Sequence, residues 1–327
     1  MPMQNMLAEF RRDALEWEKG QADLAQRLAE WRAGPAVAPV LSAMEHFGRG
    51  DPLEKCAPLA RLFADEQAAA MDFVQSFAEA GLGGLGRYPL GQLPLLHGTR
   101  QAAPALVLAS SGRASLALAA YDGSVLASMP APKTAKFVPR ETWIHVLEGS
   151  GEAELVLLRG EGGGEERGVL QSGSLALRPG TVAYRYGRRQ ALQVRSADGS
   201  LVLLRLQRRF PCREPAREYS LPDGALVHQA AARAEDTLLE LAVTLLGRMN
   251  RQDAVAPMVR IASGALDIEA GESLRWQAMR EAIALDAAAG LDLLSVLATS
   301  PGDPLAQPAA ALRASLLEVC PRLERNS

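Results

Sequence analysis

Between about Ala103 and Val227 the apolar residues change their spacing, and this change constrains the fold more than any other feature of the chain. Short apolar or alternating runs such as ALVLASSG, TWIHVLEG and SLVLLRLQ follow one another here, broken by Gly, Asp, Ser and Pro. Such runs indicate an antiparallel barrel or sandwich. On either side the apolar residues follow the period of a helix. The chain is therefore predicted to be an α+β multidomain protein.

Residues 1–82 are predicted to form a helical N-terminal region. Apolar residues recur at alternating spacings of four and three from Met3 to Trp31, with Gln21 as the one polar member, and form a narrow seam on one helix. Two interpretations stay open, because the seam can pack within its own domain or join two copies of the chain. Residues 83–100, rich in Gly and Pro, are predicted to be a non-helical connector.

Residues 101–230 hold the predicted strands, and residues 231–327 are predicted to be a helical domain. An offset of 36 residues superposes Leu238 on Leu274 and Ile261 on Leu297. Such an offset is typical of stacked helix pairs, although a plain bundle also accounts for it. One apolar face is predicted for the first helix of this domain, formed by Leu238, Leu241, Ala242, Leu245 and Leu246.

Composition excludes several classes of protein. The chain is 48% hydrophobic, which suffices for a core, and its 35 basic residues nearly balance its 38 acidic ones, which argues against a generic nucleic-acid binder. No apolar run approaches the ~20 residues that span a bilayer. The first residues contain no apolar stretch of the signal-peptide type, and the three cysteines lie far apart. We therefore expect a cytoplasmic protein of bacterial type that contacts neither membrane nor nucleic acid.

Two segments of the strand-rich region resemble the two motifs of the cupin superfamily. They are WIHVLEGSGEAELVLL, from Trp143 to Leu158, and QSGSLALRPGTVAYRYG, from Gln171 to Gly187. The matching positions are Val146, Leu147, Glu148, Gly149, Gly151 and Glu152 in the first, and Gly173, Leu175, Leu177, Pro179, Gly180 and Thr181 in the second. The resemblance implies a cupin-like β-barrel. The C-terminal region is similar, with lower specificity, to HEAT-type helical repeats.

The resemblance also implies where a metal would be bound. Cupins usually hold one inside the barrel with two or three histidines and a glutamate. In this chain the glutamate position falls on Thr142, and the last histidine position falls on Ala183 or Tyr184. His145 is three residues after Thr142, so it is expected on the opposite face of the strand. No cofactor is therefore predicted.

An enzyme remains the alternative. It would be a cupin-type oxygenase, isomerase or tailoring enzyme that binds a divalent transition metal through an atypical ligand set of His97, Glu141, His145 and Tyr184.

The segment from Arg178 to Arg217 contains ten arginines and two acidic residues. One interpretation is a solvated strand face. The other is that Arg185, Arg195 and Arg205, which lie in the middle of strands, point into the barrel and bind an anion, because guanidinium groups match carboxylate and phosphate.

Tyr184 and Tyr186 flank Arg185 and are expected to line the same opening of the barrel as Arg185. The predicted function is a non-catalytic binding or regulatory protein that recognises a small anionic ligand or a protein partner. Stacked helices suit protein recognition, and a homodimer is a further possibility.

Overall fold

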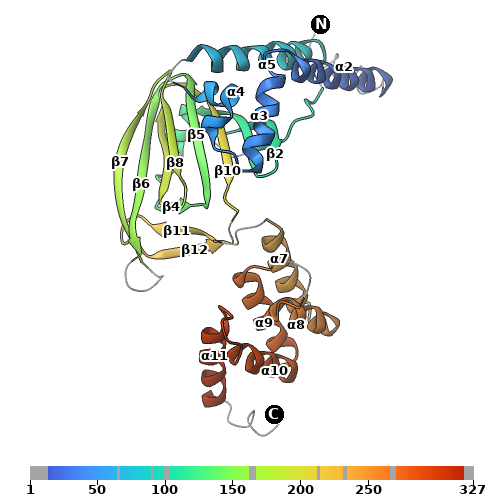
Figure 1. The fold of residues 1–327 in the computed structure, drawn as a ribbon, viewed down its shortest axis with the longest axis vertical. Coiled ribbons are helices and arrows are strands. Elements are labelled where there is room, and N and C mark those ends of the chain that lie inside the picture. The colour runs from blue at the N-terminus through green and yellow to red at the C-terminus, as the bar shows by residue number, and fades with distance from the viewer. Residues whose placement is uncertain are drawn as a thin grey trace. The chain divides into compact units, whose positions relative to one another are not determined.

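The computed structural model describes residues 14–64, 67–89, 91–98, 103–161, 167–211, 214–230, 234–265 and 270–319. The chain forms two compact units. The first comprises residues 1–210 and 218–227, and the second comprises residues 211–217 and 228–327. The N-terminal helices, drawn in blue in Figure 1, therefore belong to the same unit as most of the strands. None of the described helices combines the length and the apolar character that a membrane span requires.

The helices of the first unit are α2 (Ala14–Ala33), α3 (Ala38–Arg49), α4 (Ala57–Ala60) and α5 (Gln67–Arg87), with two short 3-10 turns, η1 (Leu53–Lys55) and η2 (Arg61–Phe63). On α2 the predicted seam is buried at Leu24, Leu28 and Trp31, while Trp17 is 46% exposed. From Leu24 onward the seam therefore packs within its own unit. Its first members, Met3 to Phe10, lie outside the described residues.

The expectation that residues 83–100 are not helical is wrong for the first part of this segment, because α5 continues to Arg87. Gly84 faces α2 so closely that a Cβ atom there would lie 2.5 Å from Leu24 Cδ2, and Gly20 of α2 is packed against the ring of Tyr88. Glycine lowers helix propensity by about 1 kcal/mol relative to alanine. The close approach of two helices offsets that cost, and it cannot be inferred from one helix alone.

The strands form three sheets. The large sheet has the order β1-β2-β3-β10-β5-β8, with β1 (His97–Gly98), β2 (Ala105–Ser111), β3 (Ala114–Asp122), β10 (Ser200–Arg209), β5 (Arg140–Glu148) and β8 (Val182–Tyr186). The facing sheet has the order β7-β6-β9, with β7 (Gly168–Leu177), β6 (Gly151–Glu161) and β9 (Gln190–Ala197). The end sheet consists of β12 (Leu226–Ala230), β11 (Ala216–Ser220) and β4 (Thr134–Phe137).

The two faces of the large sheet pack against different layers. Leu116, Leu204 and Leu206 join the N-terminal helices in one core, and Ile144, Val146 and Leu203 join Ala153 and Leu177 of the facing sheet in another. This arrangement follows from the period of two in a strand, which gives each strand two apolar faces to bury. We call the face that packs on the facing sheet the inner face.

The predicted cupin-like β-barrel is confirmed only in part. Strands occupy the predicted region, and their pairing in the large and facing sheets is antiparallel. The described strands do not close into one barrel, since β8 pairs only with β5 and β7 only with β6. The apolar run SVLASMP after Asp122, which lies in the predicted strand region, is also not a strand. It forms the short helix α6 (Gly123–Ser128), which Asp122 caps by accepting hydrogen bonds from the amides of Ser124 and Val125.

The second unit is helical, as predicted. It contains α7 (Ala234–Arg248), η3 (Gln252–Ala254), α8 (Val255–Ala262), α9 (Glu272–Leu285), α10 (Ala287–Ala298) and α11 (Ala306–Val319), around a core that includes Met258, Leu274 and Leu294. The 36-residue offset places α7 on α9 and α8 on α10. The superposed leucines are not equivalent, because Leu274 is fully buried while Leu238 is 67% exposed. A HEAT-like repeat therefore stays a prediction.

Candidate functional site

Two of the three arginines singled out from the sequence lie on the inner face of the large sheet. Arg205 on β10 pairs with Ile144 on β5, and Arg185 on β8 pairs with Thr142, two positions before Ile144 on the same strand. Because Ile144 belongs to the core between the sheets, the period of two places all of these residues on one face. Of the two interpretations left open by the sequence, the one with inward-pointing arginines matches the placement of Arg185 and Arg205.

Arg185 lies beside polar groups and, in the described part of the chain, has no acidic partner. Its Nη2 donates to the hydroxyl of Thr142 at 3.4 Å, and its Nε is fully buried without a hydrogen bond. Among the described residues no carboxylate forms an ion pair with it. Burial lowers the pKa of Arg185, Tyr121 opposes that shift, and the positive charge of Arg205 adds to it. A half-buried Arg185 guanidinium that pairs with no described carboxylate favours the approach of an anion.

Thr142 and Tyr121 were missed as members of this set. Thr142 is 3% exposed and faces Arg185 directly, and Tyr121 on β3 packs against the core between the sheets. Because Thr142 is two residues before Ile144, the alternation of side chains along a strand could have placed it on the same face. Tyr121 lies on a strand far away in sequence, so only the strand order connects it with Arg185.

Tyr184 and Tyr186 do not line the same opening as Arg185. Each is one residue from it on β8, so both lie on the opposite face of the sheet. Tyr184 packs against the Trp143 ring, and its hydroxyl donates to Glu141 at 3.4 Å. Burial and then the charge of Glu141 raise the pKa of Tyr184 to about 12. Tyr186 packs against Phe210.

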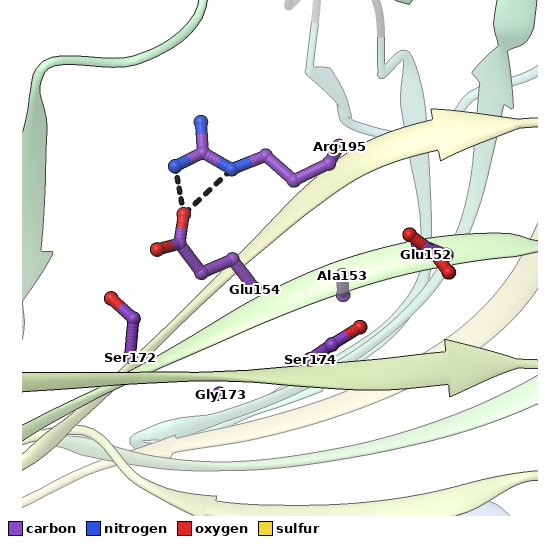
Figure 2. A pocket seen from close by; sticks show the side chains of 7 residues that line it. All are labelled: Glu152, Ala153, Glu154, Ser172, Gly173, Ser174 and Arg195. Carbon is purple, nitrogen blue, oxygen red and sulfur yellow. Dashed lines mark hydrogen bonds and ion pairs between the residues drawn. The ribbon is translucent and has the colours of Figure 1, made fainter.

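Arg195 is also separate from Arg185 and Arg205. Its Nε and Nη2 donate to the Oε2 atom of Glu154 on β6, and Figure 2 shows the two side chains pointing toward each other with Ser172 of β7 beside Glu154. Hydrogen bonds from Ser172 and Arg195 lower the pKa of Glu154. These residues line a surface pocket of about 360 Å³ together with Glu152, Ala153, Gly173 and Ser174. The expectation that all three arginines converge is therefore wrong for Arg195.

The residues at the metal-ligand positions of the cupin resemblance do not fit a transition metal. Thr142 and Ala183 lie on the inner face, where the resemblance would place ligands, but neither offers an imidazole or a carboxylate. Within the described ranges no group of three or more His, Cys, Asp and Glu side chains is arranged to hold a metal ion.

The atypical ligand set does not come together, although Tyr184 and Glu141 hydrogen-bond each other on one face of β5 and β8. His145 is fully buried on the face toward the helices, as expected from its parity, and its Nδ1 contacts the carbonyl of Leu62 at 2.8 Å. Glu141 already accepts two hydrogen bonds from Arg208. His97 is exposed on β1, four strands from β5, which corresponds to roughly 19 Å at about 4.8 Å per strand.

Comparisons with known proteins add a likeness to cupins. No family model matches the chain, and no curated protein matches it. Among solved structures it is similar to a cupin superfamily protein from Desulfitobacterium hafniense DCB-2, with 13% identity, a TM-score of 0.23 and coverage of 35% of this chain and 84% of the other.

It is also similar to a putative mannose-6-phosphate isomerase from Ralstonia eutropha JMP134, with 14% identity, a TM-score of 0.25 and coverage of 34% and 88%. The cupin domain of Drosophila melanogaster CENP-C matches with 12% identity, a TM-score of 0.26 and coverage of 34% and 74%. The neighbours thus include cupin-superfamily proteins. At TM-scores this low they indicate nothing about ligand or activity.

Proposed function

We propose that the protein is a non-catalytic binding protein that takes a small anion bearing a carboxylate or a phosphate at Arg185 and Arg205. One observation carries this proposal: the Arg185 guanidinium is buried at Nε, donates a hydrogen bond to the neutral hydroxyl of Thr142 and, among the described residues, forms no ion pair with a carboxylate. An anion would remove the cost of burying that charge, and the fork of the guanidinium suits both oxyanions.

Titration calorimetry with inorganic phosphate and with succinate as separate probes tests the proposal. Wild-type protein is expected to bind at least one probe, and Arg185→Gln is expected to weaken that binding by about 10- to 100-fold, the value of a hydrogen bond to a charged group. The probe that binds identifies the oxyanion class.

Arg189→Gln is the matched control, because Arg189 is exposed and lies in the turn between β8 and β9. Its variant should bind as the wild type does. Equal binding by the Arg185→Gln variant, with a circular dichroism spectrum that shows a folded chain, would remove the proposed site. Binding of neither probe by the wild type would do the same.

A further inference from the structure

A pocket of about 430 Å³ lies among the helices of the first unit, between the start of α3, the turn formed by α4 and η2, and α5. We call it the helical pocket. Its volume is in the range of small-molecule sites. All of its described lining residues lie between Pro35 and Phe73, so its shape does not depend on the second unit. Among them Arg61 and Asp72 are charged and the others are apolar.

The floor of the helical pocket is fixed by contacts behind it. Val40, Leu62 and Phe73 are 4%, 3% and 8% or less exposed, and all three belong to the core of the first unit. The carbonyl oxygen of Leu62 lies 2.8 Å from Nδ1 of the buried His145, and the Phe73 ring packs against the Trp31 ring with their centroids 5.5 Å apart. A ligand therefore meets a surface that is already formed, and binding does not have to order it.

Three prolines, Pro35, Pro39 and Pro58, line the pocket as well. A proline ring fixes φ and removes the amide hydrogen, so the backbone is stiff at these positions and has no N–H to offer a ligand there. The polar groups of a ligand are then recognised by the two charged side chains.

Arg61 and Asp72 line one pocket without pairing with each other. Arg61 begins η2, Asp72 lies on α5, and both side chains are exposed. Within the part of the chain that the structure describes, neither forms a hydrogen bond or an ion pair. A guanidinium group matches a carboxylate, and a carboxylate accepts hydrogen bonds from an ammonium group. A ligand that carries both charges would complement both side chains.

We propose that the helical pocket binds an amino acid with a large apolar side chain as the zwitterion. Its carboxylate pairs with Arg61, its ammonium group pairs with Asp72, and its side chain lies on the floor formed by Val40, Leu62 and Phe73. This site shares no residue with the anion site around Arg185 and does not rest on the function proposed for it.

Saturation-transfer NMR of the full chain with L-phenylalanine tests the proposal. Wild-type protein is expected to bind it with a dissociation constant on the order of 0.1–1 mM, since so small a ligand makes few contacts. Arg61→Gln and Asp72→Asn should each weaken the binding by about 10-fold, the lower end of the range for a hydrogen bond to a charged group. Both side chains are exposed, so both variants should keep the circular dichroism spectrum of the wild type.

Two analogues that carry a single charge separate the roles of the side chains. 3-Phenylpropionate lacks the amine and phenethylamine lacks the carboxylate, so each should bind the wild type about 10-fold more weakly than phenylalanine does. Arg61→Gln should bind phenylalanine and phenethylamine equally, and Asp72→Asn should bind phenylalanine and 3-phenylpropionate equally. A purely structural effect of either substitution would instead weaken all three probes together and contradict the proposal.

Arg87→Gln is the matched control, because Arg87 is exposed at the end of α5 and does not line the pocket. Its variant should bind phenylalanine as the wild type does, and so should Arg185→Gln. Loss of binding in Arg185→Gln would assign phenylalanine to the anion site and overturn this inference. A wild type that does not bind phenylalanine, or that binds 3-phenylpropionate equally well, would overturn it too.

Discussion

Arg208 connects β10 with a neighbouring strand and with the N-terminal helices of the first unit. Its Nε and Nη2 donate to Glu141 Oε2 at 2.9 and 2.7 Å, and its Nη1 donates to the carbonyl oxygens of Phe47 and Asp51 at 3.2 and 2.6 Å. The guanidinium also lies 4.1 Å from the centroid of the Phe47 ring. One residue of β10 thus joins a neighbouring strand to the end of α3.

Replacing Arg208 with Gln should lower the free energy of unfolding by about 3–5 kcal/mol, because it leaves the carboxylate of Glu141 buried without a cation. The two side chains are only 13% and 17% exposed. Urea unfolding measures the change. Arg27→Gln is the control, since Arg27 pairs with Asp23 at a more exposed position, 35% and 33%, and should change stability far less. Equal losses in the two variants would contradict the argument.

Glycine decides how closely α3 approaches the large sheet. A Cβ atom on Gly48 would overlap the carbonyl group of Ser111, at the turn between β2 and β3. Gly48→Ala should therefore destabilise the first unit by about 1–3 kcal/mol. Gly83→Ala in α5, where nothing lies within 4 Å of the added atom, should stabilise it by about 0.5–1 kcal/mol. Thermal unfolding of both variants checks the signs, and a destabilised Gly83→Ala would contradict this reasoning.

The alternation of side chains in strands and the apolar period of helices predicted the secondary-structure elements well. They predicted poorly which elements pack against one another. The alternation of side chains along β5 correctly placed His145 on the face opposite Thr142, and along β8 it allowed Arg185 to point inward, because that information is local. Arg195 escaped the same rule, since the pairing of β9 with β6 shifts between Ser196 and Val194 and leaves Arg195 as the extra residue of a bulge. For α7 the helical period of the apolar residues predicted an apolar face, but only the packing shows that Leu238 on this face is exposed.

The two compact units have separate cores. The second unit has its own buried ion pair, in which Arg275 donates to both carboxylate oxygens of Asp303 at 3.2 and 2.6 Å and to the carbonyl of Ala262 at 2.9 Å. The hydrogen bonds from Arg275 hold the pKa of Asp303 below its usual value. This pair therefore stabilises the second unit above about pH 4, and the contribution is lost as the pH falls further.

Because their cores are separate, the two units should unfold in two transitions. Arg208→Gln should lower the urea midpoint of the first unit alone, and Arg275→Gln that of the second alone. Trp276 packs against the core of the second unit, whereas Trp31 and Trp143 pack in the first. Fluorescence of a Trp276→Phe background therefore follows the first unit, while circular dichroism at 222 nm follows helices in both. If each substitution displaced both signals by the same amount, the chain would unfold as one cooperative body, and the separate cores would not act independently.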